Sequence, residues 1–328
     1  MNRRQFIALV GGVSAWPLPA WSQTPDRMRR IALMMPYGES DSESQGRIAA
    51  LRESLEKLGW TDGRNLRLDY RWDVDNPERA RAVAKELAAS APDLIMPSTT
   101  QMLAAVEAET RSIPTVFVNV SDPVGTGLVT SLAHPGGNVT GFTNFEYRTG
   151  GKWLEILKQL APAITRVAII ANPKNPNTAL YLRTIEPAAP GLGLTLTVAD
   201  VSDAAGIEEV IAAAAREANG SLLIMPDPLT TKNRELIVAA AERHRLPAAY
   251  PYRYFVALGG LFAYGIDSTD LYRGAAVYVD RILKGANPSE LPIQQPTKFE
   301  LAINLKTARS LGLTVPLTLQ AAADEVIE

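Results

Sequence analysis

Short apolar segments alternate with longer amphipathic ones along most of the chain. The short segments are rich in β-branched residues and predict strands, whereas the longer ones repeat apolar residues at the spacing of an α-helix. The strand predicted at 31–35, for example, precedes a helix with apolar positions Ile48, Leu51 and Leu55, which Gly59 ends. Such alternation is typical of βαβ units around a mainly parallel sheet.

This pattern of alternating strands and helices occurs twice. The first half predicts strands at 31–35, 66–72, 94–97 and 115–120. After a turn-rich segment, the second half predicts strands at 167–171, 194–199 and 222–225. Because the halves repeat one architecture, we expect an α/β fold of two Rossmann-like three-layer lobes with parallel sheets.

The remaining predicted elements are too few for a third domain. They are a strand at 261–266, a helix at 271–283, and a closing strand and helix at 299–311. We therefore expect the chain to cross between the lobes through several hinge segments, first at 140–145. The first lobe is predicted to comprise 30–143 plus about 252–292, and the second 144–251 plus about 293–328.

The first 22 residues have the features of an export signal. Arg3 and Arg4 precede a modest apolar stretch, and the small residues Ala20 and Ser22 suit signal cleavage before Gln23. The paired arginines favour the twin-arginine route, which places the mature protein in the periplasm. The alternative interpretation is a frayed N-terminus of a cytoplasmic protein.

Composition and charge narrow the function further. Hydrophobic residues make up 46% of the chain, yet beyond the signal no run approaches the roughly 20 apolar residues that span a bilayer. The formal net charge is −2, and it becomes −4 without the two arginines of the signal. Basic and acidic residues are interspersed along the predicted helices, which argues against nucleic acid as a partner.

Few residues suited to catalysis or metal binding are present. The chain has no cysteine, which excludes disulfides, thiol catalysis, zinc–cysteine sites and a lipoprotein anchor. Its two histidines, His134 in a turn and His244 at a helix end, are interpreted as structural. Neither a nucleophile elbow, a dinucleotide-binding glycine motif nor a phosphate loop occurs. Binding is therefore favoured over catalysis, with no cofactor.

Polar and aromatic residues gather where the predicted strands end, which is where open parallel sheets bind ligands. The candidates for ligand binding are Tyr37, Ser98, Thr99, Thr100, Asp122, Phe142, Asn175, Asn177, Asp227, Tyr250 and Asp267. Each has a structural alternative, because Ser and Thr cap helices and Asp-Pro and Asn-Pro form turns. If the two sets of strand ends face each other, these residues line a cleft.

Several short motifs, in this order, resemble one family over residues 30–328. They are Leu58-Gly59-Trp60, Asp122-Pro123-Val124-Gly125, Pro135-Gly136-Gly137-Asn138-Val139-Thr140-Gly141, Ile303-Asn304-Leu305-Lys306-Thr307-Ala308 and Ala323-Asp324-Glu325-Val326-Ile327. The chain resembles ABC transporter substrate-binding proteins of the tryptophan/tyrosine-binding type, a branch of the type I periplasmic binding proteins. The resemblance implies two lobes that close on a small ligand and dock on a membrane permease, and a monomer is expected.

The resemblance also suggests how a ligand is held. An aromatic amino acid would place its carboxylate at Thr99 and Thr100, its ammonium at Asp122 or Asp227, and its side chain against Tyr37 or Phe142.

Two basic residues depart from the family pattern. If Lys174 or Arg253 faces the cleft, an aromatic carboxylate is as plausible a ligand as an amino acid.

Three rival functions remain. A hydrolase or isomerase would use Asp122 and Asp227 as an acid/base pair. A periplasmic ligand sensor would share the fold. A transcription regulator is disfavoured, because no helix-turn-helix pattern precedes residue 30.

Overall fold

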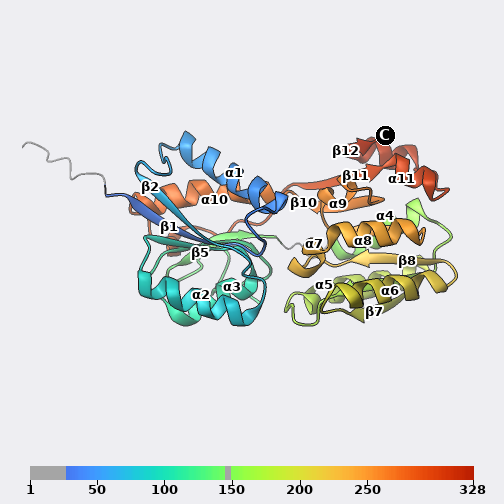
Figure 1. Ribbon diagram of the computed structural model, residues 1–328, viewed down its shortest axis with the longest axis horizontal. Coiled ribbons are helices and arrows are strands. Elements are labelled where there is room, and N and C mark those ends of the chain that lie inside the picture. Colours follow the sequence, from blue (N-terminus) through green and yellow to red (C-terminus); the bar gives the residue numbers. More distant parts are fainter. Residues whose placement is uncertain (1–26, 145–148) are drawn as a thin grey trace, which may run out of the picture.

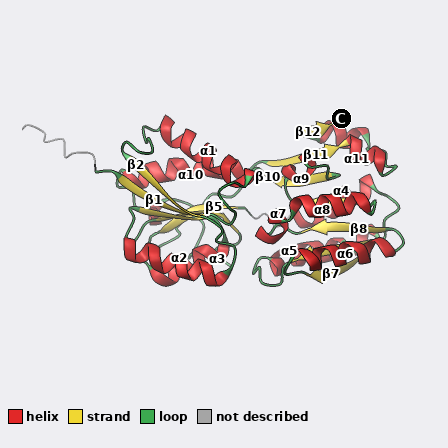
Figure 2. Cartoon of the chain, in the orientation of Figure 1, coloured by secondary structure: helices red, strands yellow, loops and turns green. Residues whose placement is uncertain are grey.

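The computed structural model describes residues 27–144 and 149–328, so the export signal predicted for residues 1–22 lies outside the described residues. The described chain forms two α/β lobes side by side, each with its own sheet and helices on both faces (Figures 1 and 2). This arrangement confirms the predicted fold class. In the described part, no helix combines the length and apolar character needed to cross a membrane.

The first lobe has a five-stranded sheet in which all strands run parallel. The strands are β1 (Arg29–Met34), β2 (Leu66–Arg71), β3 (Leu94–Pro97), β4 (Thr115–Val120) and β5 (Val139–Thr143), in the order β2-β1-β3-β4-β5. One face carries α1 (Ser42–Lys57) and α10 (Ser268–Leu283), and the other carries α2 (Pro77–Ser90) and α3 (Thr100–Glu109) (Figure 1).

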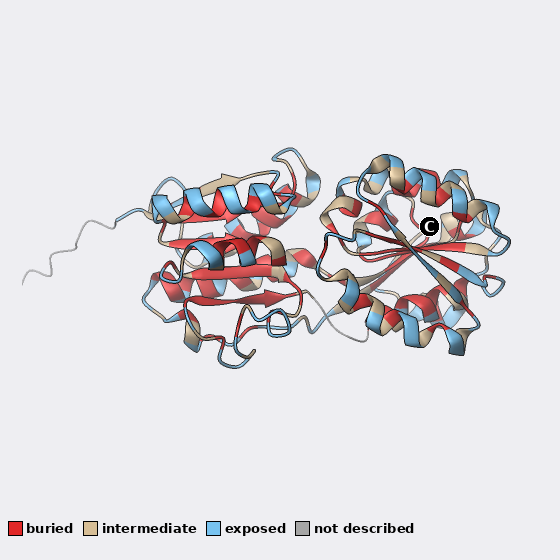
Figure 3. Ribbon diagram, turned by 90° about the horizontal axis from the view of Figure 1, so that it is seen from below, coloured by how far each residue is buried: buried red, intermediate tan, exposed pale blue. Residues whose placement is uncertain are grey.

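Strand β1 shows why both faces of this sheet are apolar. Ile31 and Leu33 pack in the layer of α1 and α10, whereas Ala32 and Met34 pack in the layer of α2 and α3. Successive side chains of a strand point to opposite faces, so a strand covered on both sides is hydrophobic throughout. The buried residues accordingly follow the sheets (Figure 3).

The second lobe has a seven-stranded sheet in the order β12-β11-β10-β9-β8-β6-β7, with β10 and β11 as its antiparallel pair. Its strands are β6 (Arg166–Ala171), β7 (Thr195–Asp200), β8 (Gly220–Ile224), β9 (Ala248–Tyr250), β10 (Phe262–Ile266), β11 (Phe299–Asn304) and β12 (Glu325–Ile327). Its helices are α4 (Thr149–Leu160), α5 (Thr178–Ile185), α6 (Ala204–Arg216), α7 (Pro228–Lys232), α8 (Arg234–Arg243), α9 (Arg253–Ala257), α11 (Leu305–Ser310) and α12 (Leu317–Ala322). Short 3-10 turns are η2 (Glu186–Ala188), η3 (Pro190–Leu192) and η4 (Pro288–Glu290).

The chain passes between the sheets three times: after β5, between β10 and α10, and before β11. The third passage runs beside the first, because the Gln294 amide donates to the Gly141 carbonyl at 2.9 Å and its carbonyl accepts from Thr143 N at 2.9 Å. Paired connections of this kind join the lobes along one edge.

Two expectations about these passages were wrong. Residues 140–143 are not a crossing but the last strand of the first sheet, and the crossing follows them. Residues 252–266, expected in the first lobe, belong to the second sheet, because β10 pairs with β11 over five residue pairs. These pairings join segments far apart in the sequence, which local patterns do not reveal.

Gly141 allows β4 and β5 to approach closely. A Cβ atom at this position would overlap the backbone oxygen and nitrogen of Phe117 in β4. By contrast, a Cβ at Gly46, on the exposed side of α1, would meet nothing within 4 Å.

We therefore expect Gly141→Ala to lower the free energy of unfolding by about 1–3 kcal/mol, because the strands must move apart. Gly46→Ala should raise it by up to about 1 kcal/mol, because alanine favours a helix interior. Urea denaturation of both variants measures the two changes, and equal effects would contradict the assigned packing of β5.

Candidate functional site

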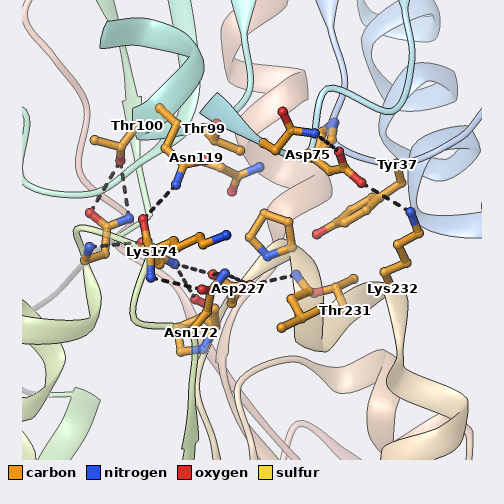
Figure 4. Close-up of a pocket in the computed structure, with 18 of the residues that line it drawn as sticks. Tyr37, Asp75, Thr99, Thr100, Asn119, Asn172, Lys174, Asp227, Thr231 and Lys232 are labelled. Atoms are coloured by element: carbon orange, nitrogen blue, oxygen red, sulfur yellow. Dashed lines mark hydrogen bonds and ion pairs between the residues drawn. The ribbon is translucent and has the colours of Figure 1, made fainter. Parts of the chain in front are cut away.

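A cavity of about 430 Å³ lies between the two lobes, at the carboxyl ends of their parallel strands. Its wall contains residues from the segments that follow β1, β3 and β4 in the first lobe and β6, β7 and β8 in the second. Figure 4 shows side chains of both lobes converging on it. A volume of this size suits an organic molecule of one or two rings.

The first-lobe wall includes the start of α3. Thr99 caps this helix, since its Oγ1 accepts from Met102 N at 3.2 Å. The hydroxyl of Thr100 accepts from Ser121 N at 3.1 Å and from Asn177 Nδ2 at 3.3 Å. Both hydroxyls are therefore committed to bonds within the protein.

The second-lobe wall is organised around Asp227, which is 5% exposed. Its Oδ1 accepts from Leu229 N at 2.6 Å and from Asn172 Nδ2 at 3.2 Å, and its Oδ2 accepts from Asn175 Nδ2 at 2.7 Å. Burial raises the pKa of Asp227 above its usual value, although these three donors oppose the increase. The asparagine-rich loop after β6 thus serves as the support of a buried carboxylate.

Several side-chain contacts among the described residues join the lobes around the cavity. Gln101 Nε2 donates to the Lys174 carbonyl at 3.0 Å, and Asn177 bonds to Thr100. On the other side, two ion pairs join the lobes: Lys232 to Asp75 at 3.2 Å and Arg234 to Asp41 at 2.8 Å. The second pair is the more buried, with side chains 11% and 16% exposed.

Tyr37 and Arg47 form a second buried group in the wall. The Arg47 guanidinium lies 5.2 Å from the centre of the Tyr37 ring, and its side chain is only 4% exposed. Burial raises the pKa of the Tyr37 hydroxyl, and Arg47 opposes this increase. At neutral pH, Tyr37 is therefore an uncharged, aromatic face of the cavity, and it lies near Thr231 in Figure 4.

The structure brings seven of the eleven predicted binding residues to this cavity. They are Tyr37, Ser98, Thr99, Thr100, Asn175, Asn177 and Asp227. Lys174 also lines the cavity, whereas Arg253 does not and pairs with Glu325 at 3.8 Å.

The other four predicted residues lie elsewhere. Asp122 belongs to a turn in which its Oδ1 accepts from Gly125 N at 2.9 Å. Phe142 packs on Tyr278 inside the first lobe, with ring centres 5.0 Å apart.

Tyr250 and Asp267 likewise have structural roles. Tyr250 is 1% exposed and stacks on Phe255 in the core of the second lobe. Asp267 caps α10, since its Oδ1 accepts from Thr269 N at 2.8 Å. These residues follow or end strands, but their side chains do not line the cavity.

Sequence reasoning missed several residues of the wall, including Arg47, Asp75, Thr231 and Lys232. Arg47 had a readable signal: it precedes Leu51 and Leu55 by one and two helical turns, so it stands on the apolar face of α1. A basic residue on such a face is buried and has a specific partner or role. Lys232 and Thr231 had no comparable signal.

Within the described residues, no cluster of acidic or histidine side chains could hold a metal ion.

Comparison with known proteins gives consistent results. A family model described as ABC transporter substrate binding protein matches residues 39–327. A tyrosine-binding protein of Clostridioides difficile (strain R20291) is 25% identical over 283 residues, which cover 86% of this chain and 80% of that protein.

Two solved structures have the same fold. A conserved domain protein of Vibrio cholerae superposes with a TM-score of 0.84 at 26% identity, covering 92% of this chain and 100% of that one. The ABC domain of Streptococcus pneumonia in complex with L-Trp superposes with a TM-score of 0.83 at 22% identity, covering 91% and 99%.

The bonds around Asp227 generate a stability prediction. Asp227→Ala removes the cap of α7 and takes away an acceptor of the buried Asn175 amide and of the half-buried Asn172 amide, so we expect a loss of about 2–3 kcal/mol in the free energy of unfolding. Asp203, the exposed cap of α6 in the same wall, bonds only to Gly206 N among the described residues. Asp203→Ala should therefore cost about 1 kcal/mol. Chemical denaturation compares the two, and the reverse order would contradict the structural role of Asp227.

Proposed function

The chain belongs to the ABC transporter substrate-binding protein family, and on that premise we propose that it binds an aromatic amino acid or aromatic carboxylate between its lobes and delivers it to the permease of an ABC importer. The observation that carries this proposal is the interlobe cavity, whose wall combines polar groups of both lobes. The export signal predicted for residues 1–22 is consistent with work in the periplasm.

We propose hinge closure as the mechanism of binding. The paired connections at Gly141 and Gln294 join the lobes on one edge, while the ion pairs of Lys232 and Arg234 join them on the other. Contacts that form only when the cleft is shut favour the closed form, and a ligand that touches both walls adds to this preference. A closed protein then presents both lobes to the permease.

The proposed class of ligand follows from the wall. Tyr37 offers an aromatic surface, and Asp227 offers a buried negative charge to an ammonium group. Both features suit the amino acids that the relatives are named for or hold, tyrosine and L-Trp.

The geometry argues against the rival acid/base enzyme. Asp122 is bonded within its own turn and does not line the cavity that Asp227 lines. A carboxylate pair must approach one reacting bond, and these two residues do not share a site. Recovery of the bound ligand in unchanged form, checked by chromatography, distinguishes binding from turnover.

A periplasmic sensor would share every feature of the site. A transport assay with the permease distinguishes a sensor from an importer component.

We expect L-tyrosine or L-tryptophan to raise the melting temperature of the protein, because a ligand that binds only the native state stabilises it. Asp227→Asn keeps an oxygen that can cap α7 but removes the charge, so affinity should fall about 10- to 100-fold in calorimetric titration. Asp267→Asn is the matched control and should retain affinity, because Asp267 caps α10 and does not line the cavity. Equal affinities in all three proteins would remove Asp227 from the ammonium site.

Closure has its own test. Arg234→Ala removes the more buried interlobe ion pair, so we expect the ligand-free protein to open more often and its radius of gyration in small-angle X-ray scattering to increase. Arg243→Ala changes an exposed arginine of the same helix, α8, for which the described residues include no ion pair. Its radius should equal that of the unchanged protein. An unchanged radius for Arg234→Ala would show that this pair does not hold the lobes together.

A further inference from the structure

Arg47 has the least satisfied charge of the arginines that line or support the cavity. Its side chain is 4% exposed, yet its ion pair with Glu43 spans 3.8 Å. Among the described residues, the other arginine pair of that length, Arg253 with Glu325, has an arginine that is 63% exposed and solvated by water. Arg234, whose side chain is 11% exposed, lies 2.8 Å from its carboxylate. Among the described residues, Arg47 is therefore the one arginine that is shielded from water without a close counterion, and it lies beside the cavity.

The neighbours of Arg47 do not supply the missing charge. Burial raises the pKa of both Tyr37 and Tyr272, so these hydroxyls stay neutral at physiological pH. Burial also raises the pKa of the Glu43 carboxyl, while Arg47 and Arg234 oppose this increase. The Nε of Arg47 is buried and has no hydrogen-bond partner. A buried cation in this situation carries a desolvation cost that a bound anion would reduce.

Among the described residues, Arg47 is the one cationic side chain in the first-lobe wall. The hydroxyls of Thr99 and Thr100, which the family resemblance suggested, accept hydrogen bonds from Met102, Ser121 and Asn177, and each can offer a carboxylate only a single neutral O–H donor. An arginine has a planar fork of donors that matches a carboxylate and discriminates it from neutral groups.

We infer that Arg47 is the residue that recognises the carboxylate of the ligand and that Tyr37 holds the guanidinium in place from the side. The inference rests on the proposed function, since it assumes a ligand of the interlobe cavity. Asp227 lies on the opposite wall, and Tyr37 lies close enough to both charges to respond to each. An amino acid would then span the lobes, with its carboxylate on the first and its ammonium on the second. The carboxylate and the ammonium of the ligand would both be paired only when the two lobes are together.

A ligand–protein double-mutant cycle tests this pairing. Calorimetric titration compares L-tyrosine with tyramine, which lacks the carboxylate, and with 3-(4-hydroxyphenyl)propionate, which lacks the ammonium. We expect the unchanged protein to bind L-tyrosine about 10- to 100-fold more tightly than tyramine, as for a hydrogen-bonded charged pair. In Arg47→Gln this preference should shrink to a few-fold, with the affinity for tyramine unchanged.

Two further variants guard against loss of fold. Arg47→Lys keeps the charge without the fork and should show an intermediate preference. Arg52→Gln changes an exposed arginine of the same helix, which bonds to Tyr70 and Asp62, and should preserve the full preference. Melting temperatures establish that each variant is folded before its affinities are compared.

The outcomes separate the inference from the proposed function. If L-tyrosine binds but Arg47→Gln and Arg47→Lys both keep the full preference over tyramine, the role of Arg47 is overturned while the proposed function stands. If 3-(4-hydroxyphenyl)propionate binds in an Arg47-dependent manner and L-tyrosine does not, the role of Arg47 is supported and the amino-acid ligand is overturned. If none of the three compounds binds to the unchanged protein, both are overturned.

Discussion

A parallel sheet that is covered by helices on both faces has no solvated surface of its own. In the first lobe, Ile31 and Leu33 are buried on one side of β1 while Ala32 and Met34 are buried on the other. Polar side chains can therefore approach the sheet only at the ends of its strands. Two such sheets meet at their carboxyl ends in this protein, and the polar cavity between them is a consequence of that meeting.

The connections between the lobes place these strand ends opposite each other. The chain returns beside its first crossing, where Gln294 pairs with the backbone of β5, and α10 packs on the first sheet although its strand β10 belongs to the second. Because each lobe is built from two separate stretches of the chain, neither lobe is independent of the connections. This topology permits a rotation about one edge while the opposite edge opens, which is the geometry that ligand-driven closure requires.

The two buried charges of the cavity differ in how the protein satisfies them. Asp227 has donors on both oxygens before any ligand arrives, from Leu229, Asn172 and Asn175. Arg47 has only a distant carboxylate and uncharged tyrosines beside it. A buried charge with few partners is costly in the empty protein, and this cost becomes binding energy when an anion of the right shape enters. Because of this difference, the first-lobe wall favours an anionic group of the ligand, and the second-lobe wall favours a cationic group.

The amino-acid sequence by itself determined the alternation of strands and helices, the two-lobed α/β fold and the candidates that directly follow strands, such as Tyr37, Thr100 and Asp227. These features depend on local periodicity and on the rule that ligands bind at the ends of parallel strands, so neighbouring residues suffice to predict them. The tertiary structure alone decided that β10 pairs in the second sheet, that Asp122 and Tyr250 do not line the cavity, and that Arg47 does. The reason is that strand pairing and side-chain direction depend on contacts between segments far apart in the chain, which no local pattern encodes.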